Sequence, residues 1–167
     1  MKQTLKVINE LKEKKIIHNY AIGGGIAALF YIEPFLTYDL DVFIIPRQRT
    51  TRKGLILLSA VFDYLKSKGY SWKGEHIIIE GVPVQFIPAD DLEQEAVESA
   101  REIEYEGIKT KVVTSEYLIV ILLRAGRKKD REKVARLLEQ AKINRNKLNA
   151  LLIKFDLKEK FNSLRGF

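Results

Sequence analysis

The 167 residues, 46% of them hydrophobic, suffice for one domain with a real core, or for one domain with a small helical appendage. The chain has no cysteine, which excludes disulfides and thiolate metal sites, and no apolar run of the roughly 18 residues that span a membrane, so we expect a cytoplasmic protein. The net charge of +7 is uneven, because residues 1–113 carry 15 Lys/Arg against 16 Asp/Glu, whereas residues 114–167 carry 14 against 6.

The first part of the chain predicts a glycine-rich turn between short elements. Apolar residues at helical spacing predict a helix over residues 2–16. A short strand over residues 19–22 leads into three glycines at 23–25. A helix over residues 26–31 begins at these glycines, and Pro34 ends it.

The middle of the chain predicts most of a mixed sheet. Short apolar runs separated by turn residues predict strands over residues 40–45, 70–72, 76–80, 82–87, 101–105 and 108–113, with a helix over 55–66 and an acidic loop with a short helix over 90–100. Hairpin turns are expected at Glu80 and Gly81 and at Glu106 and Gly107. The basic stretch at 47–53, with Arg47, Arg49, Arg52 and Lys53, is either a charged loop or a track for a polyanionic acceptor.

From residue 114 the pattern is helical, with helices over 115–125, 130–141, from Asn144 or Asn146 onward, and over 157–164. We therefore expect an α/β fold, with a mixed sheet of about five or six short strands flanked by helices and a C-terminal helical extension. The expected division is an α/β core over residues 1–113 and a basic helical region over 114–167 packed on it. This basic region favours nucleotide phosphates, nucleic acid or an acidic partner, or it is a solvated helical surface.

Two aspartates at the start of the strand over 40–45 are the main candidates for chemistry. Asp39 and Asp41 occupy alternate positions, so they share one face of the strand and repel each other unless a cation or solvent lies between them. Carboxylate oxygens and substrate phosphates are the ligands that Mg²⁺ prefers, and a glycine turn lets phosphates approach the backbone. The pair predicts a Mg²⁺ and phosphate site together with Gly23, Gly24 and Gly25; either motif alone is more often an ordinary turn or strand start.

Gly24-Gly25, thirteen intervening residues and Asp39-Leu40-Asp41-Val42 together resemble the signature of the DNA polymerase beta-like nucleotidyltransferase superfamily. Residues 21–46 resemble its small prokaryotic branch, which includes minimal nucleotidyltransferases and abortive-infection toxin-like proteins. The later Glu116-Tyr117-Leu118, Arg124-Ala125-Gly126-Arg127 and Lys129-Asp130 are similar to the helix pair that follows the sheet there. The resemblance covers roughly residues 5–140.

The resemblance implies transfer of a nucleoside monophosphate from a nucleoside triphosphate to a hydroxyl group, with Mg²⁺ on Asp39 and Asp41. It also implies a third carboxylate on a neighbouring strand, where this chain has Gln85. An amide oxygen can bind a metal, but it cannot act as a carboxylate base. Glu80, at the hairpin turn, takes the place of the third acid only if the strand register differs from the expected one.

The remaining candidates lie around these motifs. Arg124, Arg127 and Lys129 are predicted to hold the triphosphate or the acceptor, with a local Arg127–Asp130 ion pair as the alternative. Thr37 is placed to hydrogen-bond an aspartate or its turn. His18 and His76 have no metal-ligand neighbour at a useful spacing, so both are interpreted as structural.

The sequence thus supports three hypotheses about function. The first is a nucleotidyltransferase that modifies a hydroxyl of a protein, an RNA or a small molecule. The second is a non-catalytic protein of the same fold that binds a nucleotide or a protein partner, for example in a toxin–antitoxin or defence pair. The third is a nucleic-acid-binding protein that uses the basic helices. The oligomeric state stays open.

Overall fold

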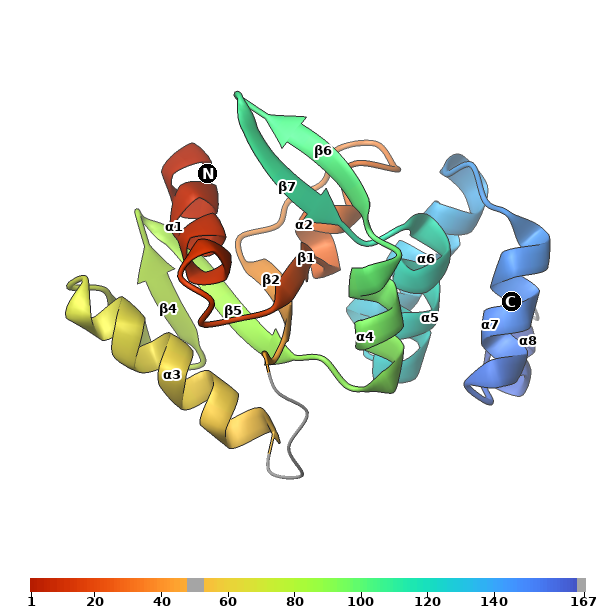
Figure 1. Cartoon of the computed structure of the whole chain (residues 1–167). Coiled ribbons are helices and arrows are strands. Elements are labelled where there is room, and N and C mark those ends of the chain that lie inside the picture. The colour runs from red at the N-terminus through yellow and green to blue at the C-terminus, as the bar shows by residue number, and fades with distance from the viewer. Residues whose placement is uncertain (48–52, 165–167) are drawn as a thin grey trace.

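A computed structural model describes residues 1–47 and 53–164. The described part contains one seven-stranded mixed sheet in the order β3-β4-β5-β2-β1-β7-β6 (Figure 1). The strands are β1 (Asn19–Ile22), β2 (Leu40–Ile45), β3 (Ser71–Lys73), β4 (His76–Ile79), β5 (Val82–Pro88), β6 (Arg101–Tyr105) and β7 (Ile108–Val112). The fold class is confirmed. The expected count of five or six strands was too low, because both edge strands, β3 and β6, join the same sheet.

Eight helices lie within the described residues. They are α1 (Lys2–Glu13), α2 (Gly24–Ala28), α3 (Lys53–Ser67), α4 (Asp91–Glu98), α5 (Ser115–Ala125), α6 (Lys128–Gln140), α7 (Arg145–Lys154) and α8 (Lys158–Leu164). The first helix ends three residues earlier than expected, and Lys15 beyond it has a φ of 59°, which no α-helix accommodates. The helix after the glycines begins at Gly24 and is only five residues long, so the expected span over residues 26–31 was wrong.

The two expected hairpin turns are present and set the register of their strands. Glu80 and Gly81 have φ of 50° and 79°, and Glu106 and Gly107 have φ of 49° and 79°. Two successive residues with positive φ form the type I′ turn, whose twist matches that of the paired strands. The β4–β5 turn therefore pairs Ile79 with Val82 and, further along, Ile77 with Val84.

The centre of the sheet brings together strands that are distant in sequence. Strand β2 runs antiparallel to β1 and parallel to β5, and in the parallel ladder Asp41 lies opposite Gln85. Along β2, Leu40, Val42 and Ile44 are fully buried, whereas Asp41 between them is only partly buried. This alternation places Asp41 and Gln85 on one face of the sheet.

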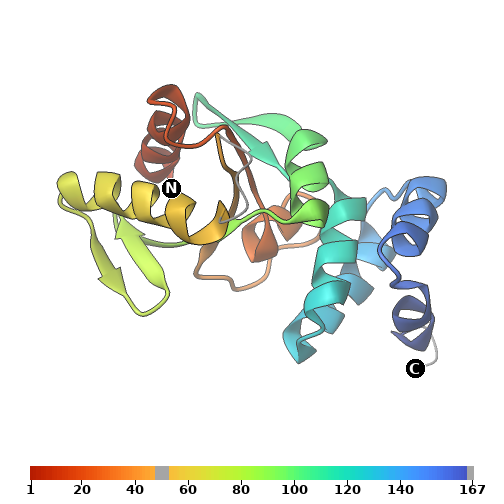
Figure 2. The same cartoon turned by 60° about the horizontal axis from the view of Figure 1, so that its bottom comes forward.

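Helix α5 is the centre of the helical side of the molecule. All residues from Ser115 to Leu123 are buried, and the helix packs against α2, α4, α6 and α7. Figure 2 shows α5 and α6 beside the sheet, with α7 and α8 on their outer side. Helix α5 ends at Gly126, which has a φ of 68° and allows the chain to turn into α6. This turn carries the Arg124-to-Asp130 segment.

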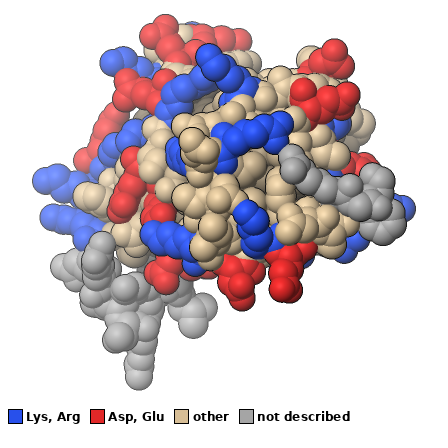
Figure 3. Space-filling view, turned by 90° about the vertical axis from the view of Figure 1, so that its right-hand side faces the viewer, with Lys and Arg blue, Asp and Glu red and all other residues tan. Residues whose placement is uncertain are grey.

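The charges of the C-terminal region are mixed on the face that Figure 3 shows. Lys and Arg side chains are interspersed there with Asp, Glu and uncharged residues. This face therefore gives no support to nucleic-acid binding through a continuous basic surface.

Most of the basic stretch at 47–53 lies outside the described residues, which leaves its predicted role open. None of the helices within residues 1–47 and 53–164 is long and apolar enough to cross a membrane.

Candidate functional site

The glycine turn touches the carboxylate of Asp41. The backbone N–H of Gly23 donates to the carbonyl oxygen of Asp41 at 2.9 Å. Gly24 has a φ of 56°, and a Cβ atom at this position would lie 1.8 Å from Asp41 Oδ2. A Cβ on Gly25 would lie 2.4 Å from Thr37 Oγ1. Glycine is therefore needed at 24 for both the backbone conformation and the close approach of the carboxylate.

The two aspartates interact electrostatically, as their spacing suggests. Burial, followed by the nearby charge of Asp39, raises the pKa of Asp41 from 3.8 to about 6. This pKa is lowered by the positive charges of Arg127, Lys129 and Lys133. The ionised form of Asp41 is thus disfavoured in the folded protein, and an added cation would stabilise it.

A cleft of about 450 Å³ opens between this part of the sheet and the α5–α6 turn. Its polar and charged lining residues are Asp41, Gln85, Glu93, Arg124 and Arg127; the others are Gly24, Phe43, Ile87, Ile121, Leu122 and Ala125. The expected position of Gln85 beside Asp41 is therefore found. Glu80 does not take its place, because its carboxylate accepts a 2.7 Å hydrogen bond from Tyr70 Oη and faces a different hollow.

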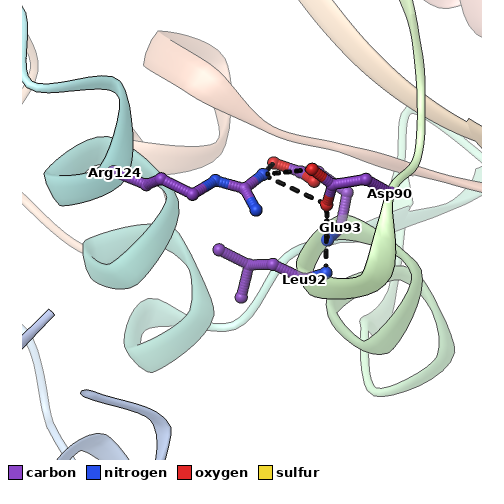
Figure 4. A network of polar contacts seen from close by, with 4 residues as sticks. All are labelled: Asp90, Leu92, Glu93 and Arg124. Carbon is purple, nitrogen blue, oxygen red and sulfur yellow. Dashed lines mark hydrogen bonds and ion pairs between the residues drawn. The ribbon is translucent and has the colours of Figure 1, made fainter. Parts of the chain in front are cut away.

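Arg124 is held by two carboxylates at the start of α4, from the N-cap residue Asp90 and from Glu93 (Figure 4). Its guanidinium donates to Asp90 Oδ1 at 3.1 Å and to Glu93 Oε1, while Asp90 also accepts the N–H of Leu92 at the start of α4. Burial raises the pKa of Glu93. Arg124 therefore lies at the cleft, as predicted for a phosphate ligand, but its charge is already balanced by these two acids.

Arg127 forms the local ion pair that its spacing allows. Its Nε donates to Asp130 Oδ2 at 2.6 Å, and Asp130 is completely buried. Lys133 Nζ lies 3.7 Å from the same carboxylate, so two cations share one acid. Arg127 still lines the cleft. Lys129 is not among the residues that line it, but its charge lowers the pKa of Asp41.

Thr37 lies against the glycine turn rather than on a carboxylate. Its Oγ1 occupies the space beside Gly25, and no hydrogen bond joins it to Asp39 or Asp41 among the described residues. The side chain therefore fills the turn from the loop before β2. Its predicted hydrogen bond to an aspartate is not formed.

His76 is the residue at this site that sequence reasoning missed. Its Nε2 lies 3.7 Å from Asp39 Oδ2 and is buried without a hydrogen-bond partner. The β4–β5 turn fixes the register that places His76 beside Gln85, but the approach of His76 to Asp39 also depends on the pairing of β5 with β2, which no local signal gives. In the described part of the chain, no three His, Asp or Glu side chains already form a metal-holding group.

The comparisons with known proteins agree with this fold. The sequence profile of the family described as "Nucleotidyl transferase of unknown function (DUF2204)" matches residues 1–162. No curated protein sequence matches the chain.

Two solved structures have a similar fold. The antigenic nucleotidyltransferase-like protein from Paracoccidioides brasiliensis is 17% identical, with a TM-score of 0.53 over 99% of this chain and 93% of its own. The antibiotic-resistance factor ANT(2'')-Ia is 14% identical, with a TM-score of 0.54 over 98% of this chain and 94% of its own. At such low identity these structures support the fold alone, whereas the profile covers nearly the whole chain. The chain belongs to the nucleotidyl transferase family of unknown function.

Proposed function

We propose that this protein transfers a nucleoside monophosphate from a nucleoside triphosphate to a hydroxyl acceptor, with Asp39 and Asp41 holding Mg²⁺. The observation that carries the proposal is the contact between the Gly24 backbone and the Asp41 carboxylate. It supports the proposal because a glycine turn lets phosphates approach the backbone and a carboxylate is a group that Mg²⁺ prefers. The cleft of about 450 Å³ lies within the ~300–1,000 Å³ range of small-molecule sites. The DNA polymerase beta-like superfamily and its small toxin-like branch remain the proposed relatives.

The residues fit a magnesium ion of the kind that nucleotides bring with them. Such ions are held by one or two carboxylates and by substrate phosphates, and they keep part of their water shell. Asp39 and Asp41 supply two carboxylates, and because burial and the charge of Asp39 raise the pKa of Asp41 to about 6, a bound cation would stabilise its ionised form. When bound, the ion would neutralise phosphate charge that develops during transfer.

The other groups in the cleft have distinct proposed tasks. Arg127, held by buried Asp130, presents positive charge at the rim for the phosphates. Phe43, Ile87 and Ile121 provide an apolar wall for a nucleobase. In the reaction, the acceptor oxygen bonds to the α-phosphorus, the bond from that phosphorus to pyrophosphate breaks, and the proton of the acceptor hydroxyl passes to water. Gln85 can orient the acceptor but cannot take its proton, so we expect slow turnover.

Calorimetric titration with ATP, GTP, CTP and UTP, each with and without Mg²⁺, tests the site. The Asp39→Asn/Asp41→Asn variant should lose Mg²⁺-dependent binding, whereas Asp63→Asn, which removes an exposed carboxylate from α3, should keep it. Unchanged affinity in the double variant would reject the proposed site. Transfer itself is measured with α-labelled nucleotide and cell extract as a source of protein, RNA and small-molecule acceptors.

The same titration isolates the role of the glycine turn. Gly24→Ala should abolish nucleotide binding, because its Cβ displaces the Asp41 carboxylate. Gly107→Ala is the matched control, since Gly107 also has a positive φ but nothing lies within 4 Å of its Cβ position. Equal binding by the two variants would show that the contact between Gly24 and Asp41 has no functional role.

A second candidate is a non-catalytic module that binds a nucleotide or a protein partner, for example in a toxin–antitoxin or defence pair. Gln85 favours it, because the strand position beside Asp41 carries an amide instead of an acid. Nucleotide binding without any labelled product would support this candidate. Transfer of the labelled nucleotide to an acceptor would exclude it.

A further inference from the structure

His76, Gln85 and Asp41 form a row across three neighbouring strands. Asp41 on β2 lies opposite Gln85 on β5, and the β4–β5 pairing of Ile77 with Val84 places His76 next to Gln85. All three side chains are partly buried, whereas the residues that follow them, Val42, Phe86 and Ile77, are buried on the other face. Strand β4 therefore brings His76, a further potential metal ligand, to the face of the sheet that carries the aspartates.

We propose that His76 is a protein ligand of the divalent ion held by Asp39 and Asp41, and that its imidazole makes this site prefer Mn²⁺ to Mg²⁺. The inference rests on the proposed function, because it requires the metal site at the two aspartates. It goes beyond that function by assigning a ligand from β4 and a different preferred ion.

The geometry suits two groups that share one ion. His76 Nε2 and Asp39 Oδ2 are 3.7 Å apart, which is longer than a hydrogen bond. Two atoms that each lie about 2.1 Å from a common metal are about 3.0–3.4 Å apart in octahedral or tetrahedral coordination. A shift of a few tenths of an ångström would bring both groups onto one ion.

The unpartnered nitrogen of His76 also requires an explanation. Its Nε2 is buried and makes no hydrogen bond within the described residues. A buried polar atom without a partner is rare in folded proteins, because it has lost water without gaining a replacement. Coordination of a cation between Nε2 and Asp39 would satisfy this atom and relieve the repulsion between the aspartates.

The donor set favours Mn²⁺ over Mg²⁺. Carboxylates suit Mg²⁺, Ca²⁺ and Mn²⁺, and of these three ions only Mn²⁺ is a transition metal, the class of ion that imidazole binds. Because Gln85 replaces the third carboxylate, the strongest additional donor beside the two aspartates is a nitrogen. Mn²⁺ accepts both hard oxygens and imidazole, and nucleotide phosphates would complete its coordination. Within the described residues no three such side chains already form a metal-holding group, so the ion and the nucleotide phosphates would have to draw Asp39, Asp41 and His76 together.

Metal affinity measured without turnover tests the proposal. Mn²⁺ is titrated by the electron paramagnetic resonance signal of the free ion, and Mg²⁺ by displacement, both in the presence of non-hydrolysable α,β-methylene-ATP. In His76→Phe the preference for Mn²⁺ over Mg²⁺ should fall by about tenfold or more, the lower end of the loss seen for groups that act on a metal indirectly. His76→Glu should shift the preference toward Mg²⁺. His18→Phe, the same change at the chain's other histidine, which lies in a different pocket, should have no effect.

A second measurement detects the ligand in protein that keeps His76. Electron spin-echo modulation of bound Mn²⁺ detects directly coordinated nitrogen, and labelling only histidine with ¹⁵N should change the modulation. The same labelling in His18→Phe assigns the nitrogen to His76. Mn²⁺ that binds through Asp39 and Asp41 without this histidine signal would overturn the inference and leave the proposed function intact. If neither Mn²⁺ nor Mg²⁺ binds together with the nucleotide, both the inference and the proposed function are overturned.

Discussion

The carboxylate of Asp41 lowers the stability of the fold at neutral pH, but the proposed function needs it. It is ionised at neutral pH although burial and Asp39 disfavour that state, so the site is strained electrostatically until a cation arrives. Functional sites commonly reduce the stability of the fold in this way. The Asp41 carboxylate also lies so close to the Gly24 backbone that a Cβ atom at position 24 would be 1.8 Å from its Oδ2.

This strain predicts how stability responds to pH in the metal-free protein. Because the folded-state pKa of Asp41 is raised from 3.8 to about 6, its contribution to stability is greatest below about pH 4 and is lost as pH rises through 6. Asp41→Asn should therefore raise the unfolding free energy at pH 7.5 by about 1–3 kcal/mol, given about 1.4 kcal/mol per pKa unit. Urea unfolding in chelator from pH 4 to 8 measures the difference, which should shrink toward pH 4. A variant less stable than wild type at pH 7.5 would contradict the assignment.

At the scale of elements, local signals and long-range pairings were not equally predictable. The hairpins could be predicted because Glu80-Gly81 and Glu106-Gly107 favour type I′ turns, whose register follows from the turn itself. The glycine turn and the aspartate strand could be predicted from their order in the chain. The partners of Arg124 could not, because Asp90 and Glu93 lie at the start of α4, 34 and 31 residues away. The same holds for the contact of His76 with Asp39, which depends on β5 lying between β4 and β2.

The parallel pairing of β2 and β5 makes Gln85 a position at which an acid should gain function. In Gln85→Glu, a carboxylate would lie opposite Asp41, where the resemblance expects the third acid. Metal affinity should rise by about tenfold, and transfer should increase by about 10²-fold, the lower limit for general base catalysis. Metal titration and release of pyrophosphate measure these effects.

The control for this substitution is Gln3→Glu, which adds the same charge on the exposed face of α1. It should change neither quantity. If Gln85→Glu binds metal more tightly but still produces no pyrophosphate, the non-catalytic candidate is favoured. Unchanged metal affinity would mean that the β5 side chain does not reach the metal.

At the scale of the whole molecule, the expected boundary at residue 113 raises the question whether residues 1–113 can fold without the helices that follow. Helix α5 follows that point, yet it is buried along nine successive residues and also forms one wall of the cleft. Its contacts with α2 and α4 connect the C-terminal helices to the glycine turn and to the Glu93–Arg124 pair. Helix α5 thus contacts elements on both sides of the proposed site.

We therefore predict that a fragment of residues 1–113 does not fold on its own. Burying a Leu, Ile or Val side chain contributes about 1.5–3 kcal/mol, so the six from Leu118 to Leu123 together exceed a typical domain stability of about 5–15 kcal/mol or come close to it. The fragment should lack dispersed amide signals and cooperative urea unfolding. In the full chain, Leu118→Ala should cost about 2–5 kcal/mol, whereas Ile153→Ala, at an exposed position on α7, should stay within about 0.5 kcal/mol of wild type. A cooperatively folded fragment would show that the first 113 residues form an independent core, and that α5 adds only the wall of the cleft.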